Sequence, residues 1–431
     1  MARGEKKKRE EKRKRQLAVW RKWTSTRCCV FRKKQKKSRE ALDKRGKGGE
    51  EGCQNGKKGQ NTGKKGAETM KTSTGARIYH TGNAGDAGDV RYLTGFAAPD
   101  PFWAAEGADG RIRLFLGALE RGRAAAACPA AEFPEGGVEE WCEKERIRRV
   151  EVSEACPVGM ADRLRAKGIA VKVAKGGGHP ERAVKSEKEL GCIRRAQRAA
   201  VAAVRRAAAV LGESEVGKGG VLRWKGKTLT SERLRREMEG VLQARGCASE
   251  DGLIAAGGRQ AAKPHEEGHG PLRAGEAIVL DVFPRHRASG YWGDLTRTLM
   301  KGPAKNPRIE AMWRAVAEAQ QVAYAMLRPG VTGAEVHKAV EAHFEAAGFP
   351  ARWTPGKERG FIHGLGHGVG LDIHEEPRLN RKGGVLRAGM VVTVEPGLYD
   401  PAVGGVRIED TVVLREGGFE FLCDMPRRMR L

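Results

Sequence analysis

The stretch His363-Gly-Leu-Gly-His367-Gly-Val-Gly-Leu-Asp-Ile-His374 is the most informative part of this chain. It places three of the ten histidines within twelve residues, among glycines that let other groups approach the backbone closely. A histidine in an apolar core is usually solitary and flanked by bulky apolar residues. Three histidines in a glycine frame therefore predict a functional site.

Four acidic residues in strand-like sequence accompany these histidines. They occur in Val-Leu-Asp281-Val-Phe, Gly-Asp294-Leu-Thr, Val-Glu395-Pro-Gly and Arg407-Ile-Glu409-Asp. Any one of them alone would be interpreted as a surface residue of a strand. A carboxylate is expensive to bury unless it is paired or holds a metal ion. Together with the histidines, the four acids predict a metal site.

The number of carboxylates predicts how many ions are needed. Two unit charges 4 Å apart repel by about 4 kcal/mol at an effective dielectric near 20. Two divalent ions would balance four carboxylates, and this donor set with one imidazole, His367, suits Mn, Co, Fe or Zn. Ions about 3.5–4 Å apart can share a water and lower its pKa toward about 7. Strand periodicity puts Arg407 and Glu409 on one face, where the arginine can orient ligand carboxylates.

Residues 75–431 resemble the aminopeptidase P and prolidase family of metallopeptidases. The resemblance rests on Gly290-Tyr-Trp-Gly-Asp294-Leu-Thr-Arg-Thr298, the histidine stretch 363–374, Val394-Glu395-Pro-Gly-Leu-Tyr399 and Val406-Arg407-Ile-Glu409-Asp. It implies an α/β (α+β) fold, in which a smaller creatinase-type α/β domain precedes a pita-bread catalytic domain with pseudo-twofold halves. It also implies a homodimer.

The same resemblance implies a role for each metal ligand. Asp294 and Glu409 would bridge the two ions, Asp281 would complete one ion, and His367 and Glu395 would complete the other. A metal-bridging hydroxide would attack the peptide carbonyl while Glu395 assists proton transfer. Manganese is the expected metal, with cobalt, iron or zinc as alternatives.

Three further histidines match positions that do not bind metal in the family. By the resemblance, His374 would bind the substrate carbonyl or the tetrahedral intermediate, and His363 would support the pocket. His265 would lie near the leaving side of the scissile bond, or it is simply a loop histidine. One departure is the spacing of thirteen positions between Asp281 and Asp294, which is longer than is usual in the family. A longer hairpin would absorb this insertion, so it affects the rim of the pocket.

Local patterns predict three regions, at residues 1–72, 73–180 and 181–431. The second region carries expected strands over 76–80, 90–96, 112–116 and 169–173, and it ends in a glycine-rich linker over 174–180. The third region carries expected helices over 186–211, 230–244, 306–327 and 332–347, two of which begin with a capping box. Strands with two acids each follow both helix pairs, which suggests two related halves facing one site.

Residues 1–72 form a basic low-complexity tail with 26 Lys and Arg against 8 Asp and Glu. The tail accounts for +18 of the net charge of +27, so the remaining residues carry only +9 (27 − 18). High charge with few apolar residues predicts disorder. The tail is interpreted as a solvated extension or as a segment that binds nucleic acid electrostatically. Met70 is an alternative start of the chain.

The rest of the composition favours a cytoplasmic enzyme. No apolar run approaches the roughly 20 residues that cross a bilayer, and the nine cysteines contain no Cys-x-x-Cys pair. The predicted function is a two-metal aminopeptidase or dipeptidase that hydrolyses Xaa-Pro bonds of short peptides. One alternative is a creatinase-like hydrolase of the same fold, and the other is a protein that binds RNA or ribosomes through its tail.

Overall fold

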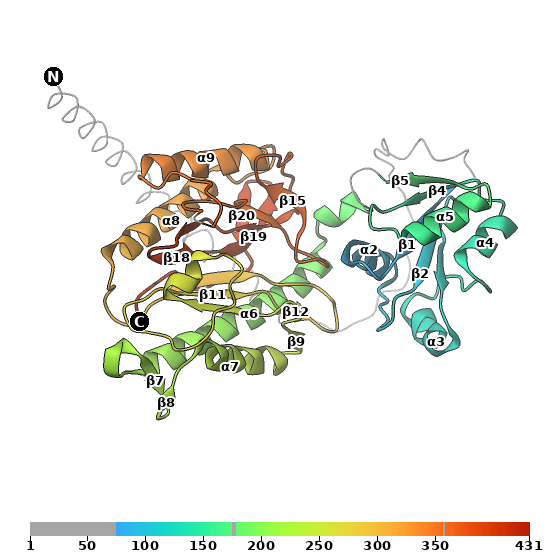
Figure 1. Cartoon of the computed structure of the whole chain (residues 1–431). Helices are drawn as coiled ribbons and strands as arrows, with labels where there is room; N and C mark the ends of the chain where they lie inside the picture. Colours follow the sequence, from blue (N-terminus) through green and yellow to red (C-terminus); the bar gives the residue numbers. More distant parts are fainter. Residues whose placement is uncertain (1–74, 175–177, 357) are drawn as a thin grey trace, which may run out of the picture. The chain divides into compact units, whose positions relative to one another are not determined.

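The computed structural model describes residues 75–174, 178–356 and 358–431 of the chain (Figure 1). The basic tail predicted over residues 1–72, including Met70, lies outside the described residues, as does part of the predicted linker.

The first described region is built on a five-stranded sheet in the order β3-β2-β1-β4-β5. Strand β1 is antiparallel to β2 and parallel to β4, so it joins an antiparallel half of the sheet to a parallel half. The elements are β1 Gly75–His80, α2 Ala84–Thr94, β2 Trp103–Gly107, β3 Ile112–Phe115, α3 Ala118–Ala127, α4 Val138–Lys144, β4 Arg149–Val152, α5 Val158–Ala166 and β5 Ala170–Val173. The predicted strands over 76–80, 112–116 and 169–173 correspond to β1, β3 and β5.

The strand predicted over 90–96 is wrong, because residues 90–94 are the second half of helix α2 and Gly95 is its C-cap. The Asn83 side chain caps the helix by accepting from the backbone N–H of Asp86 at 2.9 Å. Gly95 ends it in the left-handed conformation, with φ of 68°. These two caps bound the helix, although Val90 and Tyr92 are residue types that favour strands.

The second region begins with a 3₁₀ turn, η1 Pro180–Ala183, and consists of two halves. The first half contains α6 Glu187–Glu213, β6 Glu215–Val216, η2 Lys218–Gly220, β7 Leu222–Trp224, β8 Lys227–Thr228, α7 Ser231–Gln243, β9 Cys247–Ala248, β10 Ile254–Gly257, η3 Gly258–Ala262, β11 Ile278–Val282, β12 Arg285–His286 and β13 Leu295–Leu299. Helix α6 starts at the predicted capping box, in which Ser186 and Glu189 exchange hydrogen bonds. Strands β10, β11 and β13 form an antiparallel sheet.

The second half repeats the order of two helices followed by strands. Its elements are α8 Pro307–Met326, α9 Gly333–Ala346, β14 Gly366–Gly368, β15 Glu375–Leu379, β16 Val391–Val394, β17 Gly397–Asp400, β18 Gly404–Arg407, β19 Asp410–Arg415 and β20 Gly418–Phe421. The capping box predicted at Thr332 and Glu335 opens α9. Strands β16, β19 and β20 form an antiparallel sheet, and β14–β15 and β17–β18 pair separately.

Each helix pair covers the strands of its own half. Apolar residues of α6 and α7 pack with β10, β11 and β13 in one core. Apolar residues of α8 and α9 pack with β16, β18 and β19 in another. Figure 1 shows β11, β18 and β19 between the two helix pairs. This arrangement leaves the ends of strands from both halves facing one another.

A buried ion pair joins the two halves. Arg297 of β13 is only 1% exposed, and its Nη2 donates to Oδ1 of Asp410, the first residue of β19, at 2.6 Å. The other carboxylate oxygen of Asp410 accepts from the hydroxyl of Tyr324 at 2.9 Å and from Nε2 of Gln320 at 3.2 Å, both on α8. A desolvated charge pair is tolerable only when its remaining polar atoms are satisfied, as they are here.

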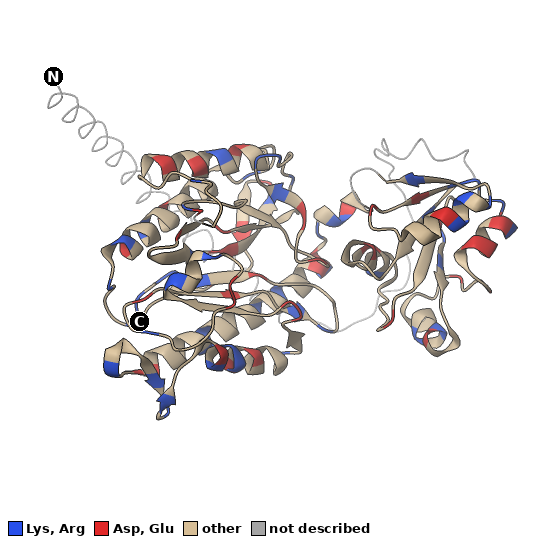
Figure 2. Ribbon diagram, in the orientation of Figure 1, with Lys and Arg blue, Asp and Glu red and all other residues tan. Residues whose placement is uncertain are grey.

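Lys and Arg are interspersed with Asp and Glu over the described helices (Figure 2). Among the described residues, we find no helix with both the length and the apolarity to cross a membrane.

We predict that Arg297→Ala lowers the free energy of unfolding by about 3 kcal/mol, because it removes the buried one of the two arginines that pair with Asp410 and leaves only the partly exposed Arg427. Denaturation in urea would measure the change. Arg165→Ala is the control, since Arg165 and Asp162 form an exposed pair, and it should cost less than about 1 kcal/mol. Equal losses in the two variants would contradict the assignment.

Candidate functional site

A cavity of about 640 Å³ lies between the two halves of the second region. All of the sequence-predicted site residues line it: His265, Asp281, Asp294, His363, His367, His374, Glu395, Arg407 and Glu409. Residues separated by more than 100 positions are therefore brought to one place. The cavity has the size of a typical small-ligand site.

Asp281 is the only one of the four acids that lies within a strand, β11. Its Oδ2 accepts from Nη2 of Arg407 at 2.7 Å. Arg407 is 3% exposed, and its Nε donates to Oγ1 of Thr296 at 3.2 Å. Arg407 thus holds the Asp281 carboxylate, and its predicted role of orienting metal ligands stays a prediction.

Asp294 directly precedes β13, and its backbone is fixed from helix α6. Its N–H donates to Oε1 of Gln197 at 2.6 Å, and its carbonyl accepts from Nε2 of Gln197 at 2.6 Å. The hydroxyl of Thr411 donates to the same carbonyl at 2.8 Å. The backbone is held on both sides, so the Asp294 carboxylate remains available to face the cavity.

Glu409 lies between β18 and β19 and is 1% exposed. Its N–H donates to the carbonyl of Thr296 at 3.0 Å, and the Thr296 hydroxyl donates to Oε2 of Glu409 at 2.8 Å. Thr296 lies opposite Asp281 in the β11–β13 pairing. One threonine thus places acids from both halves beside each other.

His367 and Glu395 form the side of the cavity that belongs to the second half. Nδ1 of His367 lies 3.1 Å from the carbonyl of Gly368, which can only accept. Nδ1 therefore carries a proton, and Nε2 lies 3.3 Å from Oε1 of Glu395 and 3.6 Å from Oδ2 of Asp294. Burial disfavours a charged imidazole, but these two carboxylates outweigh it and raise the pKa of His367 to about 9, so the imidazole is protonated on both nitrogens while no metal is bound. A carbonyl partner on one ring nitrogen is the usual arrangement of a metal-binding histidine.

The acids of the cavity cannot all ionise easily in the absence of a cation. Burial raises the pKa of Asp294, and the charge of Asp281 raises it further. Burial also raises the pKa of Glu409, with Asp294 and Glu395 adding to the effect. Burial opposes ionisation of Glu395 too, but the adjacent His367 outweighs it and lowers the pKa of Glu395 to about 2.

Two buried oxygens of this cavity have no hydrogen-bond partner among the described residues, Oδ1 of Asp281 and Oε1 of Glu409. An unpaired buried carboxylate oxygen is costly, and a cation would satisfy it. Ligand atoms of Asp294, His367 and Glu409 all lie within 4.8 Å of one another. These residues, with Asp281 and Glu395, therefore fit divalent metal ions.

A hydrogen-bonded chain links Arg407 to His363 through Tyr399. Nη1 of Arg407 donates to the Tyr399 hydroxyl oxygen at 2.8 Å, and Nε2 of His363 lies 2.9 Å from the same oxygen. Nδ1 of His363 lies 2.7 Å from the carbonyl of Gly364, so this nitrogen carries the proton and Nε2 accepts from the tyrosine. Burial lowers the pKa of His363, which keeps the imidazole neutral.

His374 and His265 occupy the more exposed part of the cavity wall. The His374 ring lies 4.3 Å from the His367 ring, measured between centroids. Burial and the neighbouring His367 lower the pKa of His374 to about 4. His374 is therefore a neutral imidazole beside the ligand group, in a position to meet a substrate.

Sequence reasoning missed several residues that hold this site. Tyr399 lies four residues after Glu395, and its contacts with Arg407 and His363 join segments that are far apart in sequence. Gln197 had a detectable signal, since it is a polar residue on the buried stripe of α6. Arg378 also lines the cavity, and its position four residues after His374 gave no local sign of this.

Residues 191–416 match the metallopeptidase family M24. A Xaa-Pro dipeptidase of Pyrococcus horikoshii is 30% identical over 290 residues, which cover 66% of this chain and 76% of that protein. A Xaa-Pro dipeptidase of Pyrococcus furiosus is 36% identical over 180 residues, which cover 42% of this chain and 49% of that protein. The chain spans about half the length of most of the relatives that it matches.

The prolidase structure from Pyrococcus horikoshii has a TM-score of 0.69 with this chain and is 26% identical. The alignment covers 83% of this chain and 95% of that structure. The predicted fold class, an α/β (α+β) chain with a pita-bread catalytic domain, is confirmed by this similarity.

We predict that Asp294→Ala and Glu409→Ala each weaken binding of divalent ions by more than about 100-fold, because each removes a carboxylate shared by the ligand group. Metal content after dialysis would measure the loss. Glu420→Ala removes a surface acid that pairs with Arg415, and it should leave metal content unchanged. Normal metal content in Asp294→Ala or Glu409→Ala would refute the ligand assignment.

We also predict a pH signature in the metal-free protein. The folded-state pKa of Glu409 is raised, so its contribution to stability is fully present below its ordinary value of about 4.5 and is lost as pH rises toward the folded pKa. Glu409→Gln cannot lose a proton. Urea unfolding should therefore show this variant gaining stability relative to the unaltered metal-free protein between pH 4.5 and 8. A difference that does not change with pH would exclude a raised pKa.

Proposed function

We propose that this chain, which belongs to metallopeptidase family M24, is a two-metal aminopeptidase or dipeptidase that hydrolyses Xaa-Pro bonds of short peptides. The observation that carries the proposal is the single cavity that gathers four carboxylates and His367, with two carboxylate oxygens unpaired among the described residues.

The metal ions would be held by five residues in the arrangement that the sequence predicted. Asp294 and Glu409 would contact both ions, Asp281 one of them, and His367 and Glu395 the other. When bound, the ions would supply a nucleophilic water at neutral pH and polarise the peptide carbonyl. Manganese is our proposed native metal, because oxygen-rich ligand sets suit it.

Glu395 is the residue that we assign to proton transfer. It lines the cavity next to His367. Burial opposes its ionisation, but His367 outweighs burial and lowers the pKa of Glu395 to about 2 in the metal-free protein, so the carboxylate is ionised. The Thr393 hydroxyl contacts Oε1 of Glu395 at 3.3 Å, which leaves Oε2 to face the reacting atoms. A carboxylate held in this way would take a proton from the attacking water and deliver it to the leaving amine.

His374 is assigned to the carbonyl oxygen of the scissile bond. Its neutral imidazole would donate a hydrogen bond that strengthens as negative charge develops on that oxygen. His363 has a supporting role, since its two ring nitrogens already contact Gly364 and Tyr399. His265 lies exposed on the cavity wall and would approach the leaving side of the substrate.

Short peptides suit the charges that line the cavity. Arg378 is 37% exposed there, and its Nη2 donates to the carbonyl of His374 at 3.2 Å. The partly free guanidinium would bind the terminal carboxylate of a short peptide. The proline preference is supported by the names of the two Pyrococcus relatives, both Xaa-Pro dipeptidases.

Homodimer formation, cytoplasmic localisation and nucleic-acid binding through the basic tail stay predictions from the sequence.

A peptide panel tests the proposal directly. The purified protein would be assayed with Xaa-Pro, Xaa-Pro-Xaa and Met-Ala-Xaa peptides in Mn²⁺, Co²⁺ or Zn²⁺. We expect hydrolysis of peptides with proline after the scissile bond and little hydrolysis of Met-Ala-Xaa. Preferential cleavage of Met-Ala-Xaa would refute the substrate class. Metal binding without hydrolysis of any peptide would favour the creatinase-like alternative.

We predict that His374→Ala retains its metal content while turnover falls by about 10²–10³, the scale of losing one donor to the developing oxyanion. Metal analysis and kcat would be measured on the same preparation. His269→Ala is the control, because this histidine is 72% exposed in a loop. Loss of metal in His374→Ala would mean that His374, and not only His367, is a ligand.

A further inference from the structure

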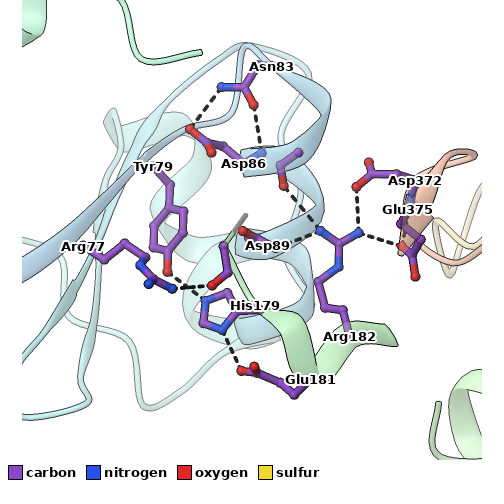
Figure 3. Close-up of polar contacts among 12 residues, drawn as sticks. Arg77, Tyr79, Asn83, Asp86, Asp89, His179, Glu181, Arg182, Asp372 and Glu375 are labelled. Carbon is purple, nitrogen blue, oxygen red and sulfur yellow. Dashed lines mark hydrogen bonds and ion pairs between the residues drawn. The ribbon is translucent and has the colours of Figure 1, made fainter. Parts of the chain in front are cut away.

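Arg182 is a buried arginine that contacts three carboxylates from two parts of the fold. Its side chain is 11% exposed, and it lies in η1 between the five-stranded sheet and helix α6. Its Nη1 donates to Oδ1 of Asp89, on α2, at 2.7 Å. Its Nη2 donates to Oδ2 of Asp372 at 2.7 Å and to Oε2 of Glu375 at 2.9 Å (Figure 3).

Asp372 and Glu375 are the two ends of a turn that carries His374. The backbone N–H of Asp372 contacts Oε2 of Glu375 at 3.4 Å, which closes the turn on itself. A second buried cation, Lys185, contacts the other carboxylate oxygen of Glu375. Arg182 therefore holds both ends of the turn, at Asp372 and at Glu375, and Lys185 holds the Glu375 end as well. His374 lies between these two ends.

The His374 imidazole has no hydrogen bond to any other described residue, and its only ring contact given by the structure is with His367. Its position therefore depends on the backbone of the turn. Space lies on both sides of that turn, since His374 lines the main cavity and also a second cavity of about 610 Å³ that Asp89 and Arg182 line. Without its anchors the turn would have room to move.

The five-stranded sheet holds helix α2, which carries Asp89, and the segment that leads into η1, which carries Arg182. In Figure 3, His179 lies between Tyr79 and Glu181, with contacts of 2.8 Å on each side. Asp86 of helix α2 accepts from the backbone N–H of His80 at 2.8 Å and from the hydroxyl of Ser153 at 3.1 Å. Helix α2 and the segment before η1 are therefore both tied to the strands of this sheet.

We propose that Arg182 is a positioning residue for His374, which it holds at the cavity by fixing the 372–375 turn to Asp89 of helix α2 in the first described region. The functional part rests on the proposed role of His374 at the substrate carbonyl. The first described region thereby contributes to turnover without touching the reacting atoms. A misplacement of about 1 Å can cost about 10²-fold in rate, so a small movement of the turn is sufficient.

The kinetic test compares Arg182→Gln with a matched control in the metal-loaded full chain. Arg113→Gln is the control, because Arg113 is 9% exposed and also pairs with two carboxylates, Asp109 and Glu132, inside the first described region. We expect Arg182→Gln to lower kcat for a Xaa-Pro dipeptide by about 10–100-fold, with KM within about twofold and metal content unchanged. The control should keep the kcat of the unaltered protein.

A double-mutant cycle separates positioning from a merely structural role. If Arg182 acts through His374, Arg182→Gln should lower kcat by less than about twofold when His374 is already alanine. A loss that multiplies with that of His374→Ala would overturn the proposal. Asp89→Asn is a milder second variant, which leaves Arg182 two of its carboxylates and should lower kcat less than Arg182→Gln does.

Amide hydrogen exchange tests the geometric part without any activity measurement. Exchange over residues 371–376 should be faster in Arg182→Gln than in the unaltered protein and in Arg113→Gln, because the turn opens more often without its anchor. Unchanged protection of this segment would overturn the proposal even if the chain hydrolyses Xaa-Pro peptides. If Arg182→Gln shows faster exchange but the unaltered chain hydrolyses no Xaa-Pro peptide, the anchoring of the turn by Arg182 is supported and only the proposed function is refuted.

Discussion

The repulsion among four carboxylates in one desolvated cavity is the constraint on which the rest of this structure depends. Each acid is held by a partner that leaves part of its carboxylate free: Arg407 for Asp281, and Thr296 for Glu409. The pKa of Asp294 and that of Glu409 are both raised in the absence of a cation. Gathering these acids costs stability, and bound cations would offset that cost. The same need for cations accounts for the two carboxylate oxygens that have no hydrogen-bond partner among the described residues.

Rigid elements from both halves are what keep these acids together. Three of the four lie just outside strands, where the regular hydrogen-bond pattern stops and a side chain can turn toward the cavity. Their backbones are nevertheless fixed by polar side chains such as Gln197, which bonds both peptide groups of Asp294. The buried pair of Arg297 and Asp410 carries this connection from β13 to β19. A site built in this way tolerates little movement.

Local patterns were enough to predict much of the fold and which residues line the main cavity. The capping boxes at Ser186 and Thr332 and the histidine stretch are short-range signals, and each corresponds to the element or cavity that was expected. Helix α2 was mistaken for a strand because its caps, Asn83 and Gly95, were not weighed. The roles of Tyr399 and Arg182 depend on contacts between residues far apart in sequence, for which a single sequence has no signal.

The division of the ligands between the two halves has a consequence for how the protein matures. Of the five proposed ligands, the first half supplies Asp281 and Asp294, while His367, Glu395 and Glu409 come from the second, so neither half alone would offer a complete coordination sphere. A chain whose halves have not closed would exchange its ions freely with the surrounding pool, and capture would coincide with the last stage of assembly. Metal would then be retained only by molecules whose halves have assembled correctly. Proteases and chaperones that act on unassembled chains would act on metal-free protein.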